Sequence, residues 1–246
     1  TLTFNNLKAA SGGKDGDTVE ELRQNSLRAF SEQKRAVTLQ DYTVRALSLP
    51  PQFGSIAKAY VTKENLANAT SMTDVNPLAL SLYTLAYDNE GKLIPASRAL
   101  KSNLKLYLSQ YMLLTDAVDI KDAFIVNIGV QFEILTLPNY ASRDILLNCT
   151  NAVKVYFDTK NWNINQPINL SNLFTILDQI KGVQTVKKIR VTNKNGGNYS
   201  LYGYDTEGAT QDNVVYPSYD PCIFEIKYPN TDIKGRVLGD NLGVRE

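Results

Sequence analysis

The sequence predicts an α+β fold in which helices pack on small mixed β-sheets. Some segments alternate apolar and polar residues, as strands do, and others repeat apolar residues every three or four positions, as amphipathic helices do. Between residues 55 and 192 the predicted order is strand, strand, helix, strand, helix, helix, strand, which gives a compact layer of helices on a sheet. We expect three segments: a helical elbow (1–50) that ends a preceding domain, an α+β domain (51–192), and a hairpin with an extended C-terminal tail (193–246).

Two capped helices are predicted in the elbow. Thr18 followed by Glu21 has the pattern of a capping box, in which a hydroxyl and a carboxylate each accept a hydrogen bond from a free backbone N–H at the helix start. Thr38 followed by Asp41 repeats this pattern with a shorter acid. A proline pair then ends the helical pattern, because proline has no N–H to donate.

The glycine-rich stretch before the first helix also suggests two kinds of ligand site, but the residues that each kind requires are not present. A phosphate-binding loop requires Lys followed by Ser or Thr, but Lys14 is followed by Asp15, and Asp17 adds a second charge that repels phosphate. An EF-hand calcium loop requires oxygen ligands at its fifth and twelfth positions. Those positions hold Val19 and Ser26, and the bidentate Glu is missing.

The α+β domain contains the clearest periodic patterns. Strands are predicted at 56–63, 79–87, 124–134 and 183–192, and helices at 97–111, 142–158 and 172–180. In the strand at 124–134 the even positions are apolar, so Asn127, Gln131 and Glu133 are expected on a wetter face. Gly182 is expected to close the third helix in a left-handed conformation.

Tyrosines are concentrated in the last segment, which also holds a predicted short strand at 222–228. Their rings could form a partner interface or a carbohydrate-stacking platform, since tyrosine offers a large contact area with a polar tip. The residues concerned are Tyr199, Tyr202, Tyr204, Tyr216, Tyr219 and Tyr228. Three nearby carboxylates, Asp205, Glu207 and Asp212, are a weak signal for glycoside hydrolysis, because no apolar pocket is evident to raise a pKa.

Composition argues against several functions. The chain has 26 Lys and Arg against 25 Asp and Glu, so its net charge of +1 provides no field to hold nucleic acid or an acidic membrane. The basic stretches at 34–35 and 187–190 are expected to be solvated. Histidine is absent, which removes the commonest general base and metal ligand. We expect no enzyme activity, no cofactor, no metal and no small-molecule substrate.

The two cysteines and the first residues complete the composition argument. Cys149 falls in the apolar stripe of a predicted helix and Cys222 near a predicted strand. One disulfide is geometrically possible, but two free, half-buried thiols in a reducing compartment are expected. The chain begins without Met or a signal sequence, and we expect it to be part of a longer or processed protein. No apolar run approaches the 18 residues or so that a membrane helix needs.

Two motifs in the elbow resemble the baseplate J-like family of contractile phage tails. The first is SGGKDGDT at 11–18, and the second is RAVT at 35–38 followed by Asp41 and Tyr42. The order of later elements is also similar, including a strand from 119 to 133, and the likeness covers most of residues 6–192. The ending FEIKYPNTDI at 224–233 is similar to the T-even-type branch, in the C-terminal part of its large wedge proteins.

This resemblance implies a structural protein of the virion tail baseplate. Family members are wedge subunits that assemble in the host cytoplasm, pair with one another and join neighbouring wedge proteins into a ring around the tail hub, which rearranges on contraction. The motif residues would hold the fold without catalytic roles: Gly12 and Gly13 in a turn, Arg23 and Arg35 anchoring helices, Thr38 and Asp41 as a cap, and Tyr42 in packing.

Overall fold

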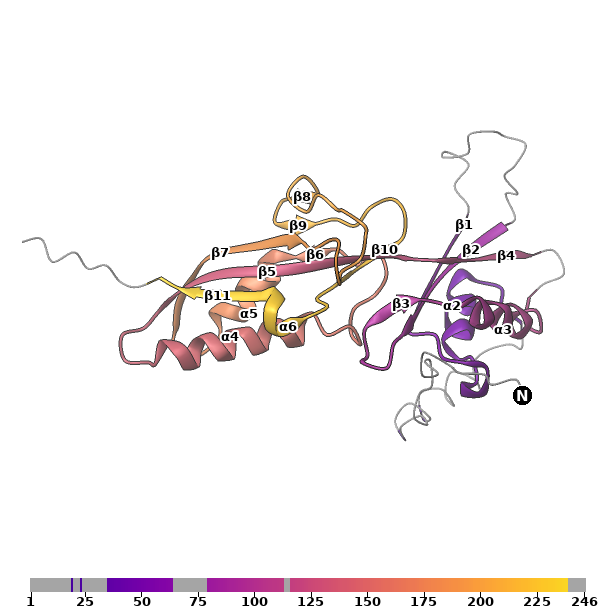
Figure 1. Ribbon diagram of the computed structural model, residues 1–246, viewed down its shortest axis with the longest axis horizontal. Coiled ribbons are helices and arrows are strands. Elements are labelled where there is room, and N and C mark those ends of the chain that lie inside the picture. Colours follow the sequence, from indigo (N-terminus) through magenta and orange to yellow (C-terminus); the bar gives the residue numbers. More distant parts are fainter. Residues whose placement is uncertain (1–18, 20–22, 24–34, 64–78, 113–115, 239–246) are drawn as a thin grey trace, which may run out of the picture. The chain divides into compact units, whose positions relative to one another are not determined.

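The computed structural model confirms the α+β fold and divides the chain into two compact units (Figure 1). It describes residues 19, 23, 35–63, 79–112 and 116–238. Unit 1 comprises residues 1–123 and unit 2 residues 124–246. This division differs from the predicted segments, whose boundaries lie near residues 50 and 192.

Each unit contains its own helices and strands. Those of unit 1 are α2 (Leu39–Leu47), the 3-10 helix η1 (Pro51–Phe53), β1 (Lys58–Lys63), β2 (Ala79–Tyr87), β3 (Leu93–Pro95), α3 (Arg98–Leu108) and β4 (Ala117–Asp122). Those of unit 2 are β5 (Phe124–Thr136), α4 (Ser142–Tyr156), β6 (Ile168–Asn169), α5 (Leu170–Asp178), β7 (Val183–Asn193), β8 (Thr210–Gln211), β9 (Val214–Val215), β10 (Cys222–Glu225), α6 (Pro229–Asp232) and β11 (Ile233–Val237).

Strand β2 is the centre of the sheet in unit 1. It pairs antiparallel with β1 and β3 and parallel with β4. Leu85 is opposite both Lys58 and Pro95, so β1 and β3 lie on opposite edges of β2. Since β1 and β4 pair with the same stretch of β2, β4 shares the edge of β3.

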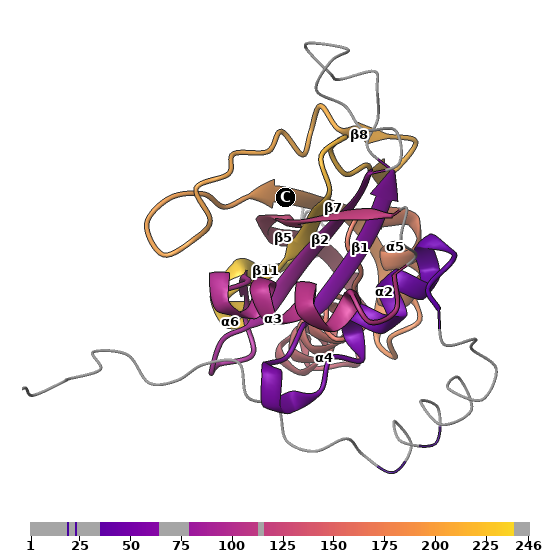
Figure 2. The same ribbon diagram turned by 90° about the vertical axis from the view of Figure 1, so that its right-hand side faces the viewer.

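Helices α2 and α3 lie together beside this sheet (Figure 2). Their apolar faces and the strands enclose a core that includes Tyr42, Leu82 and Leu104, each at most 1% exposed. Ser97 caps α3 as predicted, because its hydroxyl accepts a hydrogen bond from the N–H of Leu100 at 3.2 Å.

Strand β5 is the centre of the sheet in unit 2. It pairs antiparallel with β7 and parallel with both β10 and β11. Backbone groups of alternate residues in a strand point to opposite edges. Phe124 N–H donates to Pro221 O and Ile134 O accepts from Leu238 N–H, so β10 and β11 follow one another along one edge. Asn127 O accepts from Lys194 N–H on the other edge, which belongs to β7.

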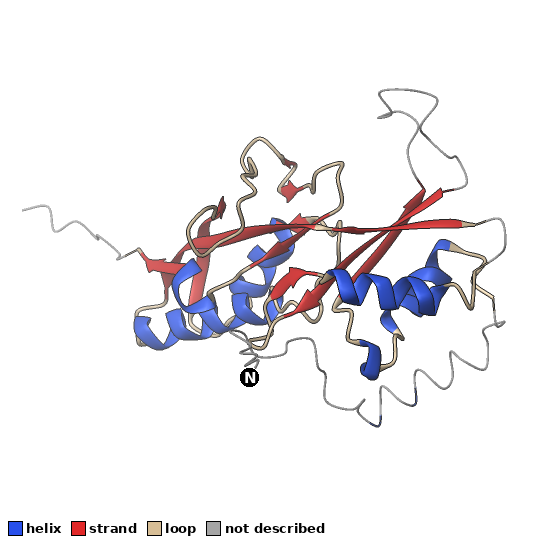
Figure 3. Ribbon diagram, turned by 45° about the vertical axis from the view of Figure 1, so that its right-hand side comes forward, coloured by secondary structure: helices blue, strands red, loops and turns tan. Residues whose placement is uncertain are grey.

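Helices α4 and α5 lie on one face of this sheet (Figure 3). Helix α4 contacts β11 and α5 contacts β7. Gly235 of β11 faces α4 closely, because a Cβ placed there would lie 2.6 Å from Leu146 Cδ1 and 2.4 Å from Phe132 Cζ. Residues 233, 235 and 237 therefore face the helices, and residues 234 and 236 face the opposite side.

Most predicted elements are present, and Gly182 has the expected left-handed φ of +99°. A short hairpin is also confirmed: β8 and β9 pair antiparallel around Asp212 and Asn213, whose φ values of +50° and +62° suit a type I′ turn. The shorter helix begins earlier than predicted. Asn169, rather than Ser171, caps it by accepting a hydrogen bond from Asn172 N–H at 3.1 Å.

Three predictions differ from the structure. The predicted strand at 119–133 is two strands, β4 and β5, which belong to different sheets. The predicted extended tail instead contains α6 and β11, because β11 completes an edge of β5. Asn127, predicted on a wetter face, is 1% exposed, since residues 194–200 cover that end of the sheet and hydrogen-bond to it.

Several predictions lie outside the described residues. These are the Thr18–Glu21 capping box, the Gly12–Gly13 turn and the loop at 64–78. Val19 and Arg23, which are described, are both helical and exposed, as the predicted first helix requires. In the described part of the chain, no helix combines the length and apolar character needed to cross a membrane.

Candidate functional site

The second elbow motif forms the start of α2. Asp41 Oδ2 accepts hydrogen bonds from the backbone N–H groups of Val37 (3.0 Å) and Thr38 (2.8 Å). Asp41 N–H in turn donates to Thr38 Oγ1 at 3.2 Å, so the predicted capping box is confirmed. The backbone hydrogen bonds lower the pKa of Asp41 below its ordinary value, because they stabilise the carboxylate.

The same motif is anchored in the core of unit 1. Ala36 is fully buried, and its N–H donates to Tyr111 O at 2.9 Å. Tyr42 is 1% exposed, and its hydroxyl donates to Asp116 Oδ2 at 2.5 Å. Arg35, by contrast, is exposed. The buried residues of the motif therefore join α2 to the segments that follow α3, and the role of Arg35 as an anchor stays a prediction.

A small aromatic cluster stands beside this joint and was not predicted. The guanidinium carbon of Arg45 lies 4.5 Å from the ring centroid of Tyr111, in cation–π geometry. The rings of Tyr111 and Tyr107 are 5.2 Å apart. Burial, followed by interaction with Tyr111, raises the pKa of Tyr107 to about 12. The helical spacing of the two tyrosines was the available sequence signal.

Two tyrosines of the C-terminal segment are bound into unit 2. Tyr199 stacks edge-on against Tyr228, with ring centroids 5.5 Å apart, and its hydroxyl donates to Asp232 Oδ1 at 2.6 Å. Tyr204 packs against Phe224 at 5.7 Å, and its hydroxyl donates to the carbonyl of Tyr216 at 2.5 Å. Their hydroxyl groups are therefore used within the fold.

Three further tyrosines, at positions 202, 216 and 219, have more exposed side chains. Tyr202 is 51% exposed although its ring meets Phe124 edge-on at 4.6 Å. Tyr216 is 49% exposed and Tyr219 is fully exposed. Since the rings of Tyr199, Tyr202 and Tyr204 pack on three different aromatic side chains, the tyrosines do not share one flat stacking surface.

A buried polar pair joins β5 to β10. The amide of Asn127 donates to Glu225 Oε2 at 2.9 Å, and both side chains are at most 2% exposed. The amide oxygen of Asn127 accepts from Ser200 N–H at 2.7 Å, which ties residues 194–200 to the sheet. Such a pair is costly to bury unless its hydrogen bonds are satisfied, so it fixes this one arrangement.

Asp232 is a second buried polar anchor, 3% exposed, at the end of α6. Its carboxylate accepts hydrogen bonds from the Tyr199 hydroxyl and from Tyr228 N–H at 2.9 Å. The hydrogen bond to Asp232, with burial and charge repulsion from that carboxylate, raises the pKa of Tyr199 to about 12. Asp232 was not predicted as a site residue, because the sequence pattern after residue 228 indicates an extended tail.

The cysteines and the clustered carboxylates have structural environments. Cys149 and Cys222 are free, as predicted, but are buried rather than half-buried, and burial raises the pKa of Cys149 to about 11. Asp205 accepts hydrogen bonds from two backbone N–H groups of the following turn. Among the described residues, no group of three or more His, Cys, Asp or Glu side chains is placed to hold a metal ion.

Solved structures include chains with a similar fold. The chain is similar to a chain in the "Cryo-EM structure of the anti-feeding prophage (AFP) baseplate, 6-fold symmetrised", with a TM-score of 0.49 and 14% sequence identity. The match covers 85% of this chain and 42% of that chain, so this chain spans less than half the length of its neighbour. The sequence matches no protein-family model, and no curated protein matches it.

Proposed function

We propose that this chain is a structural, non-catalytic component of a contractile-tail baseplate. The observation that carries the proposal is how the structure uses the motif at residues 35–42. Thr38 and Asp41 direct their polar groups to a helix end, and Tyr42 directs its hydroxyl to Asp116. The motif that resembles the baseplate J-like family is thus a packing joint, as a structural role requires.

The finer proposal is that the chain pairs with a second copy and joins neighbouring wedge proteins in a ring around the tail hub. Exposed apolar and aromatic side chains in unit 2 support a contact role, because interfaces are rich in tyrosine. Leu201 is 87% exposed and Tyr219 is fully exposed, and both lie in the excursion between β7 and β10.

Carbohydrate binding is the alternative raised by the tyrosines. A sugar-binding platform needs ring faces that are open side by side. The rings of Tyr199 and Tyr204 instead pack on Tyr228 and Phe224, and both hydroxyl groups are engaged within the fold. This packing favours the assembly role.

Electron microscopy of tail particles that carry an epitope-labelled copy of the chain tests the proposal. We expect label at the baseplate, and particles whose baseplates lack label would overturn the assignment. The double variant Tyr216→Ala with Tyr219→Ala should reduce incorporation of the chain into the baseplate while leaving its fold intact. Tyr140→Ala is the matched control, because Tyr140 is a 40% exposed tyrosine elsewhere in unit 2. A glycan array probed with the wild-type chain and with Tyr202→Ala distinguishes carbohydrate binding from the assembly role.

A further inference from the structure

The face of the unit 2 sheet that points away from α4 and α5 is covered by loop residues at one end and is open at the other. At one end, residues 194–200 and the turn at 205–208 lie against it, held by hydrogen bonds to Asn127 and to Val191. Beyond Gly129, the next two outward side chains of β5 are Gln131, which is exposed, and Glu133, which is half-buried. We call the part of the sheet from Gly129 to Glu133, with its neighbours on β7 and β11, the open face.

Strand register surrounds the centre of the open face with cations. Gln131 lies between Arg190 of β7 and Lys234 of β11, and both neighbours are exposed. These three residues form one row across the sheet. Because adjacent strands are about 4.8 Å apart, the two cations of a row stand roughly 10 Å from each other.

A second row repeats the arrangement one step along the strands. Glu133 lies between Lys188 and Arg236, both exposed. Side chains on one face of a strand recur every second residue, so the rows are about 6.7 Å apart. Arg236 and Lys234 are adjacent on the same side of β11 because Gly235 between them faces α4.

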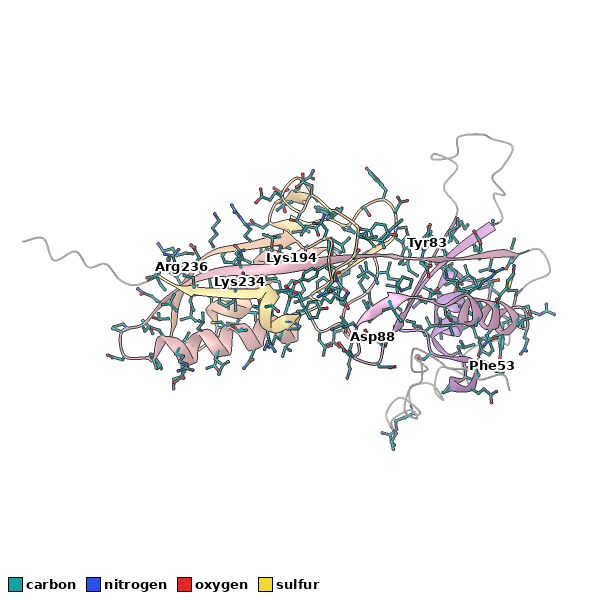
Figure 4. The ribbon with its side chains drawn as sticks, in the orientation of Figure 1. Phe53, Tyr83, Asp88, Lys194, Lys234 and Arg236 are labelled. Atoms are coloured by element: carbon teal, nitrogen blue, oxygen red, sulfur yellow. The ribbon has the colours of Figure 1, made fainter. Side chains whose placement is uncertain are left out.

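Lys194 adds a fifth cation beside the two rows, at the position of Gly129. Its Cε would lie 2.9 Å from a Cβ at Gly129, so its aliphatic stem crosses the sheet over that glycine. Figure 4 shows Lys194, Lys234 and Arg236 along β5 and β11. Five cations therefore surround a centre that carries a single carboxylate.

These charges are little neutralised within the part of unit 2 that the structure describes. Arg190 forms an ion pair with Glu207 at 3.4 Å, but both side chains are largely exposed, at 49% and 72%. No ion pair of Lys188, Lys194, Lys234 or Arg236 is present among the described residues. The open face is thus strongly positive, although the chain as a whole carries only +1.

We propose that the open face binds an acidic, extended segment of a partner protein. Carboxylates at alternate residues of an extended segment recur at the same spacing as the two rows of cations, so each carboxylate would meet one row. Gln131 supplies both a donor and an acceptor to the backbone of such a segment. This inference rests on the proposed assembly function, which supplies the partner protein. It adds the chemistry of one contact with that partner.

The composition of the face favours protein over nucleic acid. Glu133 stands at the centre of the second row, where it would repel a phosphate backbone but could accept hydrogen bonds from peptide N–H groups. No aromatic side chain belongs to the two described rows, so base stacking has no platform there.

Fluorescence anisotropy with the purified full chain tests the proposal. The probe is a labelled short peptide of alternating Glu and Thr, measured at about 50 mM and about 300 mM NaCl, since exposed charge contacts are screened by salt. We expect binding that weakens at the higher salt. The double variant Lys188→Glu with Arg236→Glu should weaken it by about tenfold or more.

The control variant makes the same change of net charge on the helix side of unit 2. Arg143→Glu with Lys181→Glu replaces two exposed cations away from the open face, and we expect less than about a twofold effect. Glu133→Gln should tighten peptide binding, because it removes the one carboxylate of the rows, and an unfolded variant would not show this gain.

The proposal is overturned if the wild-type chain does not bind the peptide, if the control variant loses as much affinity as the face variant, or if Glu133→Gln weakens binding. Tighter binding of a short oligothymidylate that the face variant abolishes would also overturn it and point to nucleic acid. Since the assay needs no tail particle, its failure leaves the baseplate-labelling result untouched, and absent label leaves the peptide result untouched.

Discussion

Units 1 and 2 are built on one plan. In each, a central strand (β2 or β5) has an antiparallel neighbour on one edge and two shorter strands in succession on the other, with helices on one face. They differ in what fills the interior. The buried polar side chains of unit 1 in the described residues are Lys58, Ser81 and Thr84, whereas unit 2 buries Asn127, Thr206, Glu225 and Asp232.

This difference follows from what each sheet must hold. In unit 1 the buried residues of α2, α3 and the strands form one apolar cluster, and α3 itself connects β3 to β4. In unit 2 the chain makes a long excursion between β7 and β10, which carries few large apolar side chains into the core. Buried hydrogen bonds from Asn127 and Asp232 attach it instead. Polar anchors fix a unique position where an apolar contact would allow several.

The largest expected effect tests whether the units are energetically separate. Phe132→Ala in β5 should cost about 3 to 5 kcal/mol by leaving a cavity in unit 2, and Leu104→Ala in α3 about 2 to 5 kcal/mol in unit 1. Hydrogen exchange measured residue by residue should show each loss confined to one unit. Equal loss of protection in both units from either variant would contradict the division.

The next effect compares the loss of a buried hydrogen-bonding side chain in unit 2 with the loss of a buried hydroxyl in unit 1. Asn127→Ala removes two buried hydrogen bonds, one of them donated to the Glu225 carboxylate, so we expect a loss of about 3 kcal/mol of unfolding free energy. Thr84→Val is the matched change in unit 1. The hydroxyl of Thr84 donates one long hydrogen bond, of 3.4 Å to Lys121 O, and its loss should cost about 1 kcal/mol or less. Urea denaturation of both variants measures the ratio.

A smaller effect should appear at high pH in unit 2. The folded-state pKa of Tyr199 is raised to about 12, so its contribution is complete below the ordinary value of 10.0 and is lost as the pH rises towards 12. Tyr199→Phe should therefore lose about 1.5 kcal/mol at neutral pH and fall less steeply than wild type between these values. Parallel pH curves for the two proteins would contradict the role of the Asp232 contact.

The smallest effect compares the two helix caps. Thr38→Ala in unit 1 and Asn169→Ala in unit 2 should each cost about 1 kcal/mol. Asp41 makes the first cap dependent on acid: its pKa is lowered, so its contribution is present above 3.8 and is lost as the pH falls below that value. Asp41→Asn should remove this dependence from thermal unfolding curves of unit 1, while the uncharged Asn169 cap should show none.

Local patterns in the sequence predicted much of the fold and little of its long-range pairing. The Thr38–Asp41 cap, the Ser97 cap and the left-handed Gly182 were confirmed because each depends on a few neighbouring residues. Strand β11 was not predicted, because its alternation of apolar and polar residues is short and is interrupted by Gly235. A larger side chain at that position would collide with Phe132, and this contact cannot be read from the sequence.

The site residues show the same limit. The tyrosines at 199–219 were recognised by type, but their division between buried and exposed roles depends on partners such as Phe224 and Asp232, which are distant in sequence. Likewise, Lys188 and Arg190 were interpreted as solvated residues. Their place in a larger array became visible only when β11 brought Lys234 and Arg236 to the other side of β5.

The parallel pairing of β11 with β5 has a consequence for synthesis on the ribosome. All strands of unit 1 have been translated once residue 122 is reached, whereas β5 at 124–136 waits for β11 at 233–237. Unit 1 is therefore free to fold first, as N-terminal domains generally do. Meanwhile the apolar β5 remains without two of its neighbours, and chaperone binding to the nascent chain is expected to concentrate there.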